Sequence, residues 1–139
     1  VASLFGVAGS SGKGGNFVNS IIKAAKQKNE ITVVNDQIMS PTSTSFIAST
    51  IYFFIKNRIY GGIFNVVCRG EVSWYEFAKK IIDLEKINCS VIPINTDTLN
   101  QKAVRPKYSA LSTKKIQKLG IEIPDYETEL ISYLAKINN

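Results

Sequence analysis

The stretch Ile31-Thr32-Val33-Val34-Asn35-Asp36-Gln37, followed by Ser40-Pro41-Thr42, decides the fold class. Ile31–Val34 is a short β-branched run typical of a buried strand, and the polar residues after it indicate a loop. Apolar residues at helical spacing then run from Phe46 to Ile55. A strand that passes through a loop into a helix is the repeating unit of α/β proteins. The sequence therefore predicts an α/β fold with mainly parallel strand pairing.

Strands and helices continue to alternate on both sides of this stretch. The apolar run Val1–Phe5 predicts a strand, and Asn16 is a suitable cap for the helix that follows. Ile63–Val67 is typical of a buried strand. Val91–Ile94 is expected at a sheet edge, because Pro93 has no N–H to donate to a ladder.

Three more helices are indicated by their end signals. Ser73 and Glu76 form a capping box at the start of one helix, since each side chain can bond a free amide near the other residue. A second helix is expected from about Thr113 to Leu119, with Gly120 ending it. Asp125 is expected to cap the last helix.

Composition and charge exclude several classes of protein. The 139 residues are 45% hydrophobic and 20% charged, which excludes a disordered or fibrous chain. No apolar run reaches the roughly 18 residues of a membrane span. The net charge of +6 comes from scattered basic residues, without the interleaved aromatic rings of a nucleic-acid site. We therefore expect a cytoplasmic protein with no nucleic-acid or membrane partner.

Metal sites and the common nucleophile pairs are also excluded. The chain has no histidine, and Cys68 and Cys89 lack CxxC spacing. Neither a zinc site nor a Ser-His or Cys-His pair can therefore be assembled. With no signal peptide in view, both thiols are expected to be free in a reducing cytoplasm.

A glycine-rich loop is similar to the dinucleotide fingerprint but departs from its spacing. Gly6, Gly9 and Gly12 form a GxxGxxG after the first strand, and Asp36 ends a later strand. In the fingerprint the last glycine lies in the first turn of the helix, where free amides face the phosphates. Here Lys13-Gly14-Gly15 intervenes before the helix begins. We interpret the loop as a connection and expect no cofactor-binding residue in it.

Two Tyr-x-x-x-Lys pairs are similar to the catalytic pair of short-chain dehydrogenases, in which lysine lowers the tyrosine pKa. They are Tyr52 with Lys56 and Tyr75 with Lys79. Two pairs with this spacing are unremarkable in a chain this rich in lysine and tyrosine. We interpret them as packing tyrosines with solvated lysines and expect no catalytic residue here.

Two segments carry polar residues that regular structure does not require. The loop from Asn35 to Thr42 suits either recognition of a polar ligand or a plain strand-to-helix connection. Arg105, in a poorly structured stretch, is either a ligand for an anion or a solvent-facing side chain.

Several motifs occur in a fixed order along the chain. They are Val1–Gly6, Gly14–Val18, Val33–Gln37 with Ser40–Thr42, Ser73–Ala78, Arg105–Leu111, and Leu119-Gly120 with Pro124–Glu127. Together they resemble the C-terminal half of dTDP-4-dehydrorhamnose reductases, a family of extended short-chain dehydrogenases. The resemblance covers essentially all 139 residues. Its most specific parts are the runs VVNDQ-x-x-SPT and RPKYSAL.

The resemblance implies that residues 1–139 are the substrate-binding C-terminal portion of a Rossmann-like enzyme, a fragment without the dinucleotide-binding half. Val1–Phe5 and Ile63–Val67 would complete the parallel sheet beside a small mixed α/β region. In the family, NADPH delivers hydride to the C4 ketone of dTDP-4-dehydro-6-deoxy-L-mannose, giving dTDP-L-rhamnose. The family's cofactor glycines and catalytic Ser/Thr and Tyr-x-x-x-Lys precede the matched region. The fragment is therefore expected to be inactive alone.

Position in the matching motifs also implies which residues bind the dTDP-sugar. They are Asn16 and Phe17 at the helix entry, Gln37, Pro41 and Thr42 in the loop, and Arg105 facing the pyrophosphate. Many family members carry tryptophan where Ser3 stands, which leaves the sugar contacts at that position open.

An alternative is a non-catalytic regulatory relative that resembles the β-subunit of methionine adenosyltransferase. An upstream sequence with the fingerprint but without the tyrosine pair would favour that alternative. We also expect a homodimer or poor solubility, because an uncovered Ile63–Val67 would expose unpaired backbone.

Overall fold

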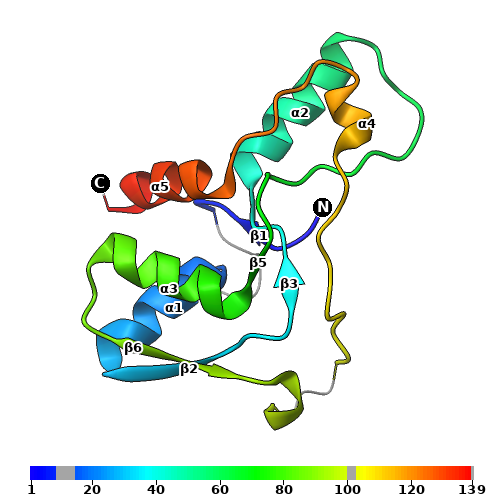
Figure 1. Ribbon diagram of the computed structural model, residues 1–139. Helices are drawn as coiled ribbons and strands as arrows, with labels where there is room; N and C mark the ends of the chain where they lie inside the picture. The colour runs from blue at the N-terminus through cyan, green and yellow to red at the C-terminus, as the bar shows by residue number, and fades with distance from the viewer. Residues whose placement is uncertain (9–14, 100–102, 139) are drawn as a thin grey trace.

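The computed structural model describes residues 1–8, 15–99 and 103–138. Strands and helices alternate as predicted, which confirms the α/β class (Figure 1). The elements are β1 (Leu4–Phe5), α1 (Phe17–Gln27), β2 (Glu30–Val34), β3 (Ile38–Met39), β4 (Thr42–Ser43), α2 (Thr44–Lys56), β5 (Val72–Ser73), α3 (Trp74–Glu85), β6 (Ser90–Ile94), a 3₁₀ turn (Thr96–Thr98), α4 (Lys114–Gln117) and α5 (Tyr126–Ile137).

The strands form three pairs, two of which are parallel. β1 pairs with β4 and β2 with β6 in parallel, whereas β3 and β5 are antiparallel. Within the described residues β6 pairs with β2 alone, which confirms the predicted edge strand. Ser90 N–H donates to the Asn29 carbonyl at 2.8 Å, and Asn35 N–H donates to the Ile94 carbonyl at 2.9 Å. Because backbone groups alternate between the two sides of a strand, the N–H that Pro93 lacks would point to the open edge.

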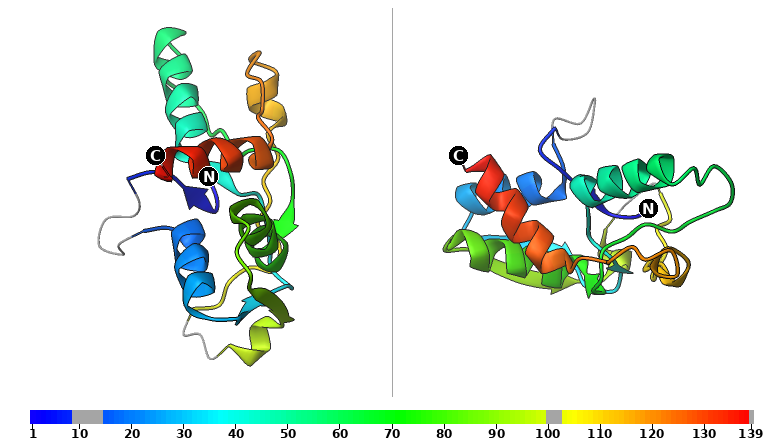
Figure 2. Two further views of the ribbon diagram at one scale, coloured as in Figure 1. Left: turned by 90° about the vertical axis from the view of Figure 1, so that its left-hand side faces the viewer. Right: turned by 90° about the horizontal axis from the view of Figure 1, so that it is seen from above.

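Two helices cover one face of the β2–β6 pair, and a third closes the core. α1 and α3 lie side by side on this face, and α5 packs against α3 and β4 (Figures 1 and 2). The fully buried side chains between these layers include Phe5, Val18, Phe77, Ile81 and Leu130. The buried faces of α1 and α3 contribute Val18, Ile21, Ala25, Phe77, Ala78, Ile81 and Ile82 to this core. The starts of both helices lie next to the end of β1.

The predicted helix caps are all present. Asn16 Oδ1 accepts the Asn19 N–H at 3.1 Å, and Asp125 Oδ1 accepts the Glu127 N–H at 3.0 Å. The capping box is also formed, with Ser73 N–H donating to a Glu76 carboxylate oxygen at 2.8 Å. α4 is shorter than predicted, since Lys118 N–H makes its last i→i−4 bond and the N–H groups of Leu119 and Gly120 donate to carbonyls three residues back.

Two predicted strands differ from the structure. Ile63–Val67 forms no ladder, because no strand of the described residues lies beside it; Val66 and Val67 are buried while Ile63 is 86% exposed. The strand predicted at Val1–Phe5 is confined to Leu4–Phe5, because Ser3 has a left-handed backbone with φ of +49°.

α2, the connection after it and α4 stand away from the rest of the molecule (Figures 1 and 2). Phe46 and Thr50 face the body of the protein, whereas Ile51, Tyr52 and Ile55 are more than half exposed. In the described part of the chain, no helix is both long and apolar enough to cross a membrane.

Candidate functional site

Two neighbouring cavities open at the starts of α1 and α3, and they share three side chains. The larger, of about 700 Å³, lies beside the end of β1, and the smaller, of about 330 Å³, lies along β2. Phe17, Trp74 and Arg105 line both cavities. We therefore treat them as the larger and smaller chambers of one cleft.

An aromatic pair separates the two chambers. Phe17 and Trp74 are the first residues of α1 and α3, and their ring centroids are 4.5 Å apart at an interplanar angle of 53°. Phe17 also stacks on buried Phe77, with centroids 5.8 Å apart and an angle of 13°. Each of the two helices starts at a side-chain cap, which fixes the backbone from which each ring extends. Aromatic faces held in this way suit the stacking of a planar base.

Arg105 supplies a positive charge where the chambers meet. Its side chain is exposed on the segment that precedes α4, and it lines both chambers. Within the described residues it forms no salt bridge. Because a guanidinium can bind two phosphate oxygens at once, an unpaired arginine in a cleft is suited to a pyrophosphate.

Asn16 shapes the wall of the larger chamber. Its Nδ2 donates to the Gly6 carbonyl and to the Tyr133 hydroxyl, both at 3.0 Å. Its Oδ1 is the cap of α1. The Asn16 side chain is thus fully used in joining β1, α1 and α5, and it borders the chamber rather than reaching freely into it.

Gln37 borders the smaller chamber and is similarly bonded. Its Nε2 donates to Thr96 Oγ1 at 2.9 Å, and the Asp36 carboxylate accepts the Thr96 hydroxyl at 2.6 Å and the Thr96 N–H at 2.9 Å. The bond from the Thr96 hydroxyl has the largest effect on the pKa of Asp36 and lowers it, and the bond from the Thr96 N–H lowers it further. Asp36 therefore joins the loop after β2 to the turn after β6, a structural role.

The backbone of β2 forms one side of the smaller chamber. The bonds to β6 are made on one edge of β2, by residues that include Asn29 and Asn35. Thr32 and Val34 therefore direct their N–H and C=O groups to the opposite edge, which no other strand of the described residues occupies. Both residues line the smaller chamber. The free N–H and C=O groups of β2 could therefore form hydrogen bonds with the donors and acceptors on the edge of a nucleotide base.

Pro41 and Thr42 do not reach the cleft. Both are fully buried, and Thr42 lies in β4 opposite Leu4 of β1. The Thr42 hydroxyl donates to the Ser40 carbonyl at 3.0 Å and accepts the Cys68 N–H at 3.2 Å. Of the six residues expected to bind substrate, the structure therefore brings four to one cleft. The other two lie outside it, Thr42 in β4 and Pro41 directly before that strand.

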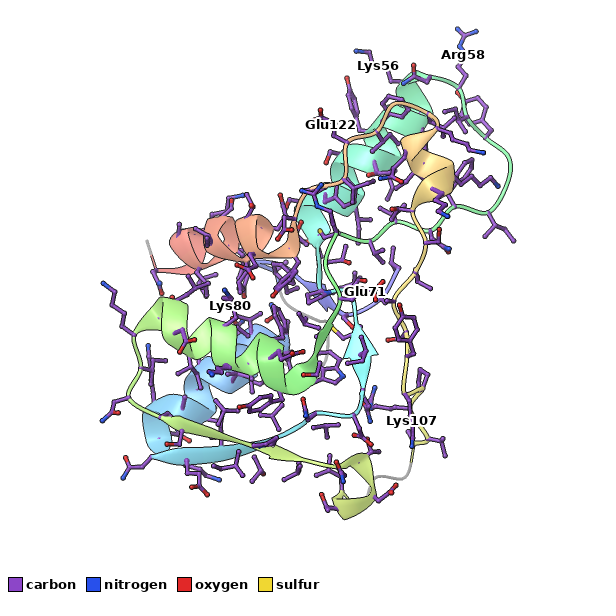
Figure 3. The ribbon with its side chains drawn as sticks, in the orientation of Figure 1. Lys56, Arg58, Glu71, Lys80, Lys107 and Glu122 are labelled. Carbon is purple, nitrogen blue, oxygen red and sulfur yellow. The ribbon has the colours of Figure 1, made fainter. Side chains whose placement is uncertain are left out.

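The two Tyr-x-x-x-Lys pairs lie outside the cleft. Tyr52 is 66% exposed on α2, and Lys56 lies at the far tip of that helix (Figure 3). Neither this pair nor Tyr75 with Lys79 lines the cleft. Gly6 borders the larger chamber, whereas Gly9 and Gly12 lie outside the described residues.

Outside the cleft, the described residues provide neither a metal site nor a reactive thiol at Cys68. No metal-binding group of His, Cys, Asp or Glu occurs among the residues that the structure describes. Burial raises the pKa of the Cys68 thiol to about 11, so it stays protonated near neutral pH.

The sequence missed Trp74 as a cleft residue, because its helical spacing indicated packing. The signal was present in the capping box. A tryptophan directly after the cap lies at the first helical position, where a side chain can border a cavity at the helix start.

The family described as RmlD substrate binding domain matches residues 1–139. The chain is 36% identical over 123 residues to the spore coat polysaccharide biosynthesis protein SpsK of Bacillus subtilis, covering 88% of the chain and 43% of SpsK. It is 28% identical over 130 residues to the dTDP-4-dehydrorhamnose reductase of Escherichia coli K12, covering 84% and 43%. The chain thus spans less than half the length of these relatives.

Solved structures agree with these sequence matches. A dTDP-4-dehydrorhamnose reductase of Clostridium acetobutylicum superposes with a TM-score of 0.90 at 32% identity, covering 99% of this chain and 47% of that one. The reductase of Bacillus anthracis, solved in complex with NADP, gives 0.83 at 34% identity, with 96% and 45% covered. The chain therefore belongs to the RmlD substrate binding domain family, as the resemblance in its motifs predicted.

Proposed function

We propose that this chain binds a dTDP-deoxyhexose in the cleft. The base would occupy the smaller chamber, against the aromatic pair and the free edge of β2. The pyrophosphate would lie at Arg105, and the sugar would enter the larger chamber toward Ser3. This ligand class is supported by the relatives of the chain, several of which are dTDP-4-dehydrorhamnose reductases.

The observation that carries the proposal is the place of Arg105. It is a cation with no salt-bridge partner among the described residues, at the point where two chambers meet and beside an aromatic pair that borders both. A nucleotide-sugar has its base and its sugar on opposite sides of a dianionic pyrophosphate. The cleft repeats this order of aromatic surface, positive charge and second chamber.

As a whole-protein activity, we propose NADPH-dependent reduction of a dTDP-4-keto-6-deoxyhexose in dTDP-L-rhamnose biosynthesis. The NADP-bound relative supports the cofactor. The matched part is 43–47% of these relatives. Among the residues that the structure describes, no tyrosine–lysine pair lines the cleft. In this proposal residues 1–139 hold the substrate, and cofactor and proton transfer need groups outside them, so the isolated chain is inactive.

Titration with dTDP tests the binding site. Trp74 is the only tryptophan of the chain, so its emission reports directly on the cleft. We expect dTDP to change this emission saturably and Arg105→Ala to abolish the change. Lys107→Ala is the matched control, because Lys107 is on the same segment (Figure 3) and lines neither chamber. Equal loss in both variants would indicate attraction by net charge alone and contradict the assigned site.

A further inference from the structure

We propose that Tyr133, on the last helix of the chain, is a positioning residue of the cleft. It touches neither chamber of the cleft. It acts through Asn16, by fixing the first turn of α1 and with it the ring of Phe17. The inference rests on the proposed function, because the cleft it serves is the proposed nucleotide-sugar site.

The Tyr133 hydroxyl joins three segments that are far apart in sequence. It accepts the Asn16 Nδ2–H at 3.0 Å and donates to Asn19 Oδ1 at 2.6 Å. Asn16 in turn donates to the Gly6 carbonyl at 3.0 Å. One phenol from α5 therefore bonds two side chains in the first turn of α1, one of which holds the end of β1.

The Tyr133 ring fixes the position of this hydroxyl. The side chain is 4% exposed, and its ring meets Phe5 edge-on, with centroids 5.5 Å apart at 71°. A buried ring packed in this way has little freedom to turn. The hydroxyl is therefore a rigid point against which the start of α1 is held.

The consequence for the cleft follows from the chain order. Phe17 directly follows Asn16, and its ring must lie 4.5 Å from that of Trp74 to form the wall shared by both chambers. If the first turn of α1 shifts, this ring moves with it. Asn16 keeps its cap bond to Asn19 N–H without Tyr133, so loss of the hydroxyl is expected to loosen the turn rather than unfold the helix.

α5 supplies a matched control in Tyr126. This tyrosine is also buried, at 6% exposure, and within the described residues its hydroxyl bonds to the neighbouring Glu127 alone, at 3.2 Å. Tyr126→Phe removes a phenol oxygen from α5, just as Tyr133→Phe does, but it leaves the bonds to α1 untouched.

The experiment compares Tyr133→Phe with Tyr126→Phe in the 139-residue chain. We expect Tyr133→Phe to weaken dTDP binding about fivefold, the worth of one typical hydrogen bond, and Tyr126→Phe to leave it within about twofold. The emission of Trp74 in the ligand-free protein should shift only in Tyr133→Phe, because only there does the Phe17 ring move. Thermal unfolding of both variants measures their stability separately from binding.

Each result decides the proposal. Equal weakening in the two variants, or none in Tyr133→Phe, would overturn it. If Tyr133→Phe does not fold, hydrogen exchange of the unaltered chain takes its place: dTDP should slow amide exchange in α5 as well as α1, since coupling is reciprocal, and unchanged exchange in α5 would overturn the proposal. If the unaltered chain binds no dTDP, the proposed function fails, and the Trp74 emission of the two variants still decides the positioning role.

Discussion

The turn at Gly70 offers a sharp test of how α5 is joined to the rest of the fold. Its φ is +105°, a conformation that L side chains rarely adopt, and an added Cβ would lie 2.4 Å from Tyr126 Cδ1. The flanking Arg69 N–H donates to the Pro124 carbonyl at 2.9 Å, and Tyr126 N–H donates to the Arg69 carbonyl at 3.0 Å. The Tyr126 ring is therefore held over the glycine and has no simple way to move aside.

The cost of Gly70→Ala is the sum of two effects. A non-glycine residue in this backbone region costs about 1–3 kcal/mol, and overpacking a buried contact costs about 1–3 kcal/mol. We expect a total near 4 kcal/mol. At about 3 °C per kcal/mol for a chain of this size, Tm should fall by about 12 °C.

Two other glycines separate the effects. Gly120 has φ of +83° with open space around it, so Gly120→Ala measures the backbone cost alone. Gly61 has open space and no such φ, so Gly61→Ala should be neutral or stabilise by about 0.4–1 kcal/mol. Urea unfolding followed by circular dichroism measures all three changes. If Gly70→Ala costs no more than Gly120→Ala, the packing of Tyr126 on this turn is refuted.

Three further predictions concern the Ser73 cap of α3, the loss of stability at acid pH, and the reactivity of the two thiols. Ser73→Ala should lower the free energy of unfolding by about 1 kcal/mol in urea denaturation, because the capping box is lost; an unchanged midpoint would contradict this. The lowered pKa of Asp36 means that its contribution to stability is present above pH about 4 and disappears as pH falls through the lowered value. Thr96→Val should therefore flatten the loss of stability on acidification, and an identical pH profile would argue against that bond. A thiol reagent at neutral pH should modify Cys89 before buried Cys68, whose pKa is raised to about 11, and both equally in urea; equal rates in the native protein would be the opposing result.

Local signals predicted the helices well. The caps at Asn16, Ser73 and Asp125 are short-range bonds between residues close in sequence. Apolar spacing marks the buried faces of α1 and α3, but not that of α2, where Ile51 and Ile55 are exposed. Strand pairing depends on partners far away in the chain. Ile63–Val67 has strand-like composition, but the described residues offer no ladder for it, and composition alone could not reveal that.

The candidate site was predicted in part for the same reason. Motif position selected Phe17, Gln37 and Arg105, and the structure places all three along the smaller chamber. It could not show that Thr42 pairs with β1, because that register is set by a segment 38 residues earlier. Trp74 was overlooked, since a tryptophan at helical spacing has the same pattern whether it packs in a core or borders a cavity.

Calorimetric titration of the 139-residue chain with dTDP and, separately, with NADPH tests the central claim most directly. The cleft predicts binding of one dTDP per chain, lost in Arg105→Ala, and no heat of binding with NADPH. Absence of dTDP binding would contradict the account, and binding of NADPH in its place would show that the chain selects the cofactor instead of the nucleotide-sugar.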